Sequence, residues 1–157
     1  MSGTPHPSVR PISFLLGTWA GEGTGAWPPD AEPFAYGEEL TFEDVGDEFL
    51  LYSQRSWASS DGSPLHFERG FLRPVEAGRV EFVLAHPLGV VELAEGSVAH
   101  GVIDVASTHV AATPTGSPVT ALRRRIEVRD DVLRYELWMA TRDVPLGRHL
   151  RAELKRA

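Results

Sequence analysis

Hydrophobic and polar residues alternate over several short stretches of the chain, most regularly in Val132–Met139. Side chains of a β-strand point alternately to opposite faces, so such a stretch predicts a strand that is buried on one face. The apolar set is expected to point into the protein, and the opposite set outward. The inward set comprises Leu133, Tyr135, Leu137 and Met139, and the outward set comprises Arg134, Glu136 and Trp138.

Similar stretches follow one another along the chain, separated by turn sequences such as SSDGSP, EAGR and TPTGSP. The one helical signal is a short turn over Val9–Leu16, which Ser8 is expected to cap. The remaining pattern predicts about ten short strands. They are expected at Gly17–Trp27, Phe34–Asp44, Glu48–Ala58, Leu65–Leu72, Val80–Ala85, Leu88–Ala94, His100–Ser107, Thr108–Thr113, Val119–Val128, Val132–Met139 and His149–Arg156.

Short connections favour a meander in which each strand pairs with its neighbour in sequence, and closure of the meander removes its exposed edges. We therefore predict an all-β fold, an antiparallel up-and-down β-barrel of about ten strands like those of lipocalins and fatty-acid-binding proteins, with a short N-terminal helical turn. Such a barrel holds one small ligand, and Met139 is expected nearest its open end. Residues 1–10 are expected to be a flexible lead-in, and residues 11–157 a single domain.

The composition narrows the possible functions. The chain has 157 residues, a net charge of −7 and no cysteine. The negative charge argues against nucleic acid or a membrane surface as partner. The lack of cysteine excludes disulfides, thiolate catalysis, iron–sulfur clusters and cysteine-type zinc sites. The N-terminal residues contain no apolar run, so we expect no signal peptide and a cytoplasmic location.

The segment GTWAGEGTGAW, residues 17–27, has an unusual strand face that consists of glycines between two tryptophans. Two explanations remain open. The glycines let a bent strand pack closely at a barrel corner, or they let a flat ligand lie against the backbone. Trp19 is expected to plug the barrel floor.

Histidine is the one strong metal-ligand type that the sequence offers, and no HxH, HExxH or close histidine pair is present in it. His66 begins one strand and His149 precedes the last, whereas His86 is expected to be a turn residue. One histidine and a large apolar pocket are what a haem requires. Glu38 and Glu39 face opposite sides of a strand, and no GxSxG or helix-opening GxGxxG motif occurs.

An ordered set of motifs resembles the nitrobindin family of haem-binding β-barrels. GTWAGEG fits the family pattern G-x-W-x-G-x-G, and LHFERGFLRP resembles its H-x-E-x-G strand. PFAYGEELTFEDVGDEFLLYSQRSW, RYELWMA and the closing PLGRHLRAELKR resemble further strands of the family. The resemblance covers nearly the whole chain from Phe14 onward.

The resemblance implies haem b, one per subunit, at the open end of the barrel, with His149 as the axial iron ligand. It also implies reversible binding of nitric oxide and isomerisation of peroxynitrite to nitrate by the ferric iron. Further residues that it places at the haem are Gly17, Trp19, Gly21, Gly23, Leu65, His66, Ser117 and Met139.

Two positions depart from the family pattern. Pro29 replaces a threonine, and Ser117 stands near the position of a lysine that would contact a haem carboxylate. Two other functions remain open, a nitric oxide sensor or carrier with the same haem and a haem-free carrier of a fatty acid or other apolar ligand. A basic anchor inside the pocket would favour the fatty-acid carrier, but Arg123–Arg125 are expected on or near the surface.

His149 presents a geometric difficulty for the haem interpretation. Leu150, Ala152 and Leu154 form the apolar face of the last strand, so strict alternation puts His149 on the opposite face. The side chain reaches the interior only if His149 precedes the regular strand or lies at a bulge. Gly147 just upstream permits such a departure of the backbone.

Overall fold

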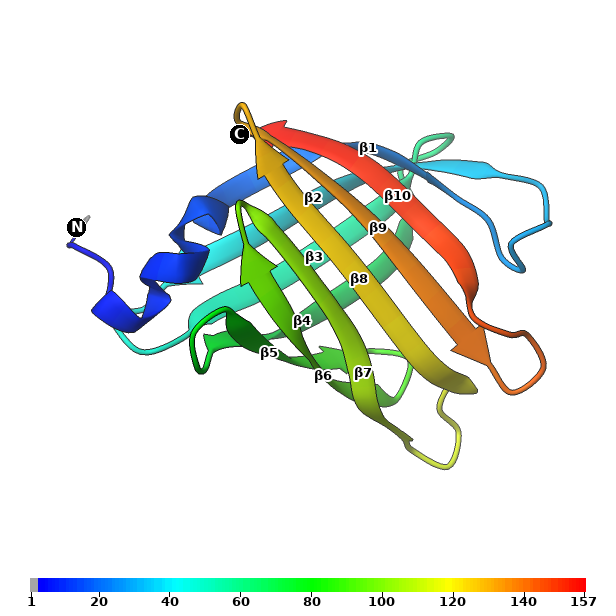
Figure 1. Ribbon diagram of the computed structural model, residues 1–157. Helices are drawn as coiled ribbons and strands as arrows, with labels where there is room; N and C mark the ends of the chain where they lie inside the picture. Colours follow the sequence, from blue (N-terminus) through cyan, green and yellow to red (C-terminus); the bar gives the residue numbers. More distant parts are fainter. Residues whose placement is uncertain (1–2) are drawn as a thin grey trace.

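The computed structural model describes residues 3–157, which form a closed, ten-stranded antiparallel β-barrel with a short helix at one end (Figure 1). Each strand pairs with its sequence neighbour, and the first strand also pairs with the last, as in Gly23 opposite Ala152. The prediction of an up-and-down barrel is confirmed. The strands are β1 (Gly17–Gly25), β2 (Phe34–Asp44), β3 (Leu50–Ala58), β4 (Pro64–Pro74), β5 (Arg79–His86), β6 (Val90–Ala99), β7 (Val102–Ala112), β8 (Val119–Arg129), β9 (Val132–Thr141) and β10 (Gly147–Arg156).

The helix η1 (Pro7–Leu15) is a 3₁₀ helix that closes one end of the barrel (Figure 1). Three residues of this helix are fully buried, namely Val9, Ile12 and Leu15. Trp19 is also fully buried, and its Nε1 donates a hydrogen bond to the carbonyl oxygen of Leu15 at 2.8 Å. Trp19 therefore joins the helix to the barrel floor. Within residues 3–157, no helix is long and apolar enough to cross a membrane.

The start of η1 differs from the sequence prediction. The helix begins at Pro7, and its N-cap is His6, whose Nδ1 accepts a hydrogen bond from the backbone N–H of Ser8. Ser8 is thus not the cap. Residues 7–10 form the first part of η1, in which Val9 is fully buried. Residues 1–2 of the expected lead-in lie outside the described residues.

The strand faces follow the predicted alternation in β9, where Leu133, Tyr135 and Leu137 are buried. In contrast, the two strands predicted at 100–107 and 108–113 form a single strand, β7. Ser107 pairs with Ala94 and His109 with Leu93, which leaves Thr108 as an extra residue in a bulge. The bulge reverses the alternation and makes one strand look like two in the sequence.

The bare face of β1 is filled by aromatic rings from the neighbouring strand β2. Gly23 lies opposite Tyr36 and Gly25 lies opposite Phe34. A Cβ atom at position 23 would come within 2.5 Å of the Tyr36 ring and 2.6 Å of the carbonyl oxygen of Arg151. The structural explanation of the glycine face therefore accounts for Gly23, because its missing side chain makes room for a buried ring.

We expect Gly23→Ala to destabilise the barrel by about 1–3 kcal/mol, because the added methyl group overpacks the wall against the Tyr36 ring and a backbone carbonyl. Thermal unfolding followed by circular dichroism measures this effect. Thr24→Ala, one residue along on the exposed face, is the matched control and should change stability little. Equal effects of the two substitutions would contradict the packing explanation.

Candidate ligand cavity

A cavity of about 310 Å³ lies in the half of the barrel that η1 does not close. This volume is at the lower end of the range for small-molecule pockets. Exposed apolar side chains surround the mouth, among them Phe34, Leu65 and Leu88. Both apolar and polar side chains line the cavity. The apolar lining includes Val90, Val119, Leu122, Ile126, Leu137, Met139 and Leu150.

His149 lines this cavity because the backbone of β10 is bulged at that residue. Arg148 pairs with Trp138 and Leu150 pairs with Leu137, so His149 is the extra residue between two regular pairs. The bulge resolves the conflict with strict alternation. The geometry that the haem interpretation required at this position is present.

The environment of His149 favours a neutral ring in one tautomer. Its Nδ1 lies 3.0 Å from the carbonyl oxygen of Ala26, which accepts the Nδ1–H and leaves the lone pair on Nε2. Burial lowers the pKa of His149. The rings of Trp27 and Phe34 contact the imidazole edge-on, with centroids at 5.3 and 6.4 Å. Such a held, neutral imidazole is suited to bind a metal.

The structure brings some of the predicted site residues together and leaves others apart. Leu65, His66, Ser117 and Met139 line the same cavity as His149. Pro29 packs close to Gly147, where a Cβ would approach its Cγ within 2.6 Å. Among residues 3–157, the cavity wall does not include the predicted haem neighbours of the GTWAGEG motif, namely Gly17, Trp19, Gly21 and Gly23. Neighbouring side chains or backbone atoms already occupy the space beside these four residues.

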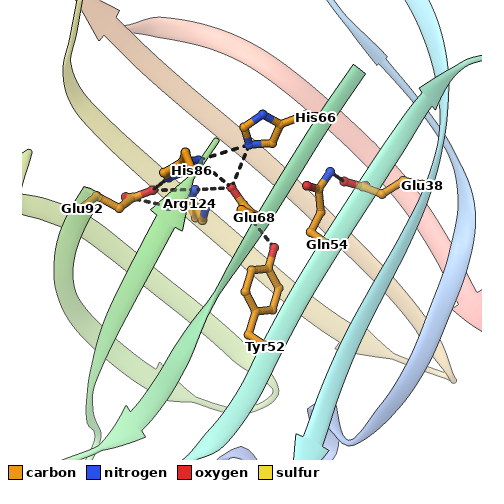
Figure 2. A network of polar contacts seen from close by, with 8 residues as sticks. All are labelled: Glu38, Tyr52, Gln54, His66, Glu68, His86, Glu92 and Arg124. Carbon is orange, nitrogen blue, oxygen red and sulfur yellow. Dashed lines mark hydrogen bonds and ion pairs between the residues drawn. The ribbon is translucent and has the colours of Figure 1, made fainter. Parts of the chain in front are cut away.

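Charged side chains form a buried network (Figure 2), and most of its members line one wall of the cavity. Arg124 contacts both oxygens of Glu92 at 2.7 Å and lies 3.3 Å from Oε2 of Glu68. His86 Nε2 lies 2.8 Å from Oε1 of Glu92. The hydroxyl of Tyr52 donates to Oε1 of Glu68 at 2.7 Å. Every carboxylate in this network therefore has a cationic or hydrogen-bonding partner, as burial requires.

The sequence interpretation missed this network. Arg124 was expected on or near the surface and His86 in a turn, but Arg124 is 5% exposed and the His86 side chain 6%. His66 and His86 are a close pair in space, with Nε2 and Nδ1 3.1 Å apart, although 20 positions separate them in sequence. The alternation of side chains in β8 could have indicated the inward position of Arg124, because Arg124 lies between the inward residues Leu122 and Ile126.

Contacts within the network set the pKa values of its buried charged groups. Burial alone would raise the pKa of Glu68 and Glu92, but the Arg124 guanidinium and nearby histidines outweigh burial and hold both values below the usual range. Burial likewise opposes the charge of Arg124, but Glu92 and Glu68 raise its pKa. All three groups are therefore charged at neutral pH.

Glu38 lies near this network on β2 and is 1% exposed. Its Oε2 accepts a hydrogen bond from Nε2 of Gln54 at 2.8 Å, whereas its Oε1 has no partner among the described residues. Burial raises the pKa of Glu38 to about 7, although the Gln54 hydrogen bond acts in the opposite direction. Glu38 is thus the carboxyl group of the cavity that changes charge near neutral pH.

We expect Glu38→Gln to stabilise the protein at pH 8 and to have little effect at pH 4. As the pH rises from 4.5 to about 7, the unfolded chain releases the Glu38 proton while the folded chain keeps it, so the free energy of unfolding falls. The free energy of unfolding falls by about 3 kcal/mol in total, and a neutral glutamine at position 38 avoids this loss. Urea unfolding at several pH values measures the difference. A difference that did not change with pH would contradict the raised pKa.

Comparisons with known proteins show what the whole chain resembles. A family model described as "THAP4-like, heme-binding beta-barrel domain" matches residues 8–156. "Peroxynitrite isomerase 2" of Mycobacterium marinum is 46% identical over 155 residues, which cover 96% of each chain. "Peroxynitrite isomerase" of Nocardia farcinica is 43% identical over 96% of this chain and 92% of the relative. The crystal structure of Rv2717c from M. tuberculosis superposes with a TM-score of 0.89 and 41% identity, covering 98% of this chain and 99% of that one.

Proposed function

Because the chain belongs to the family of THAP4-like, heme-binding β-barrel domains, we propose that it binds haem in the cavity and isomerises peroxynitrite to nitrate. The sequence resemblance to nitrobindins is confirmed by this membership. The relatives from M. marinum and Nocardia farcinica carry the name peroxynitrite isomerase over nearly their full lengths. We further propose haem b, one per chain, with reversible binding of nitric oxide and a cytoplasmic location.

The observation that carries this proposal is the bulge at His149. The bulge directs the neutral imidazole of His149 toward the cavity. Nδ1 of this ring already donates a hydrogen bond to the carbonyl oxygen of Ala26. A histidine ligand of a metal usually donates its second ring N–H in this way, which fixes the tautomer and the ring orientation. The residues present therefore fit a haem, whose iron would be held by Nε2 of His149.

Other residues of the cavity would bind and shield the cofactor. Leu65, Leu88 and Met139 offer apolar surface to a porphyrin and exclude water from the reacting centre. Ser117 would donate a hydrogen bond near the mouth. When bound, ferric haem supplies the iron at which peroxynitrite rearranges to nitrate.

His66 and His86 lie on the wall of the cavity opposite His149. In the ring of strands, four strands separate β10 from β5 in either direction. His66 and His86 therefore face the cavity from the side across from the proposed iron ligand. Hydrogen-bonding groups placed there would meet the ligand that enters the cavity.

The third interpretation, a haem-free carrier of a fatty acid, requires a free cation in the cavity. Arg124 is the buried cation of the network, but it is paired with Glu92 and Glu68. Its charge is more than offset by these two carboxylates. An anionic fatty-acid headgroup would therefore have to displace these carboxylates from Arg124, so the structure favours the haem protein over this carrier.

The rate of peroxynitrite decay tests the proposed enzyme. The full chain loaded with ferric haem should accelerate the decay in stopped-flow measurements, in proportion to its concentration. The haem-free chain at equal concentration is the control. A protein that binds haem and nitric oxide but leaves the decay unchanged would be a sensor or carrier instead. Equal acceleration by the haem-free chain would show that the iron is not the catalyst.

A further inference from the structure

Three potential ligand atoms converge on the cavity wall opposite His149. Nε2 of His66, Oε2 of Glu68 and Nδ1 of His86 form a triangle with sides of 3.1–3.2 Å (Figure 2). His66 and Glu68 are two residues apart on the inward face of β4, and His86 ends the adjacent strand β5. Strand alternation therefore places His66 and Glu68 on the same face of β4.

The three atoms are oriented so that each can face an ion placed between them. Nε2 of His86 faces the acceptor Glu92, which leaves Nδ1 as the ring nitrogen directed to the triangle. Oε2 of Glu68 lies 3.2 Å from this Nδ1 and 3.2 Å from Nε2 of His66. Two imidazole nitrogens and one carboxylate oxygen are therefore available as ligand atoms at one point of the wall.

The spacing of the three atoms matches that of ligands around a first-row metal ion. Metal–nitrogen and metal–oxygen bonds of about 2.0–2.2 Å at tetrahedral or octahedral angles place neighbouring ligand atoms roughly 3.0–3.4 Å apart. Two imidazoles and one carboxylate are a donor set for divalent zinc, iron and related ions. All three side chains line the cavity, so water or a small ligand in the cavity would reach an ion bound there.

The surrounding residues hold the triangle in place as metal ligands require. The Glu92 carboxylate orients His86 through its Nε2, and Tyr52 orients Glu68 through Oε1. Glu68 and Glu92 carry two negative charges against one positive charge on Arg124, which pairs most closely with Glu92. The two carboxylates outnumber the single guanidinium, which favours a cation at the triangle.

We propose that His66, Glu68 and His86 form a binding site for a divalent first-row transition metal, separate from the proposed haem ligand His149. The site has three protein ligands, all of which line the cavity. Such an ion would bind and polarise a small anion or water in the same cavity.

Zinc titration of the full chain, prepared without haem, tests this site. Isothermal calorimetry should show one Zn²⁺ bound per chain. His86→Gln and Glu68→Gln should each weaken binding at least tenfold, since each removes one ligand. Glu92→Gln should weaken it by about 10- to 100-fold through the orientation of His86. Circular dichroism checks that each variant is folded.

Histidines outside the triangle provide matched controls. His109→Gln and His100→Gln alter exposed histidines and should leave zinc binding unchanged. His149→Ala should also retain it, because that side chain is on the opposite wall. Zinc binding that survived His86→Gln, or that was lost in one of these three controls, would overturn the proposal.

A second measurement needs no variant. Paramagnetic Co²⁺ added to the wild-type chain should shift and broaden the ring-proton resonances of His66 and His86 in NMR spectra. The resonances of the exposed His100 and His109 should move little. Selective shifts of the exposed histidines would show that the metal binds at the surface and would contradict the site.

Discussion

His149→Ala is expected to abolish the histidine-ligated haem spectrum and to lower haem affinity by more than about 100-fold. Loss of a residue that only orients a metal ligand costs about 10- to 100-fold, so loss of the ligand itself should cost more. The cavity remains after the substitution, since His149 is one of many lining residues. Titration with hemin, followed by absorption spectroscopy, measures both effects.

Two substitutions serve as controls for this result. His66→Ala changes the opposite wall of the cavity and should preserve the axial bond while altering the spectrum of bound ligands. His109→Ala, on the outer surface of β7, should behave like the wild type. If His66→Ala removed the histidine-ligated spectrum and His149→Ala kept it, the axial assignment would be wrong.

Arg124→Met is expected to destabilise the protein by about 3–5 kcal/mol, because it leaves the buried charges of Glu68 and Glu92 without their cation. For a chain of this size the melting temperature should fall by roughly 10 °C. Calorimetry at pH 7 measures this change. The difference should shrink on acidification, since protonation of the two glutamates then relieves the repulsion.

The neighbouring Arg125 offers the matched control. Its side chain is 42% exposed and pairs with Glu127 at 3.1 Å on the outer surface. Arg125→Met should therefore cost less than about 1 kcal/mol. Adding Glu68→Gln and Glu92→Gln to Arg124→Met should recover part of the lost stability. Equal effects at positions 124 and 125 would contradict a buried role for Arg124.

The fold was predictable because it depends on local patterns, whereas the interest in His149 came from the family resemblance and not from alternation. Alternation in β9 identified its inward face, and Gly147 indicated where the chain leaves regular geometry before His149. Residues 100–113 were misread because one extra residue at Thr108 reverses the alternation, and the sequence contains no mark of a bulge.

Alternation indicates that Arg124 points inward, but its partners in the charged network were not predictable from local patterns. Arg124 pairs with Glu92 and Glu68, which are 32 and 56 positions away in sequence. A charged residue on an inward face is costly until such partners are known, so a surface position is the ordinary expectation. The closure of the barrel brings these distant strands together, and closure is a property of the complete fold.

The central claim is that iron held by His149 converts peroxynitrite to nitrate, and the product distribution tests it most directly. With the haem-loaded wild-type chain, the nitrate fraction should rise and added free tyrosine should be protected from nitration. His149→Ala, treated with hemin in the same way, should give the product distribution of the uncatalysed reaction. Equal nitrate yield and equal protection of tyrosine by the two proteins would contradict the account.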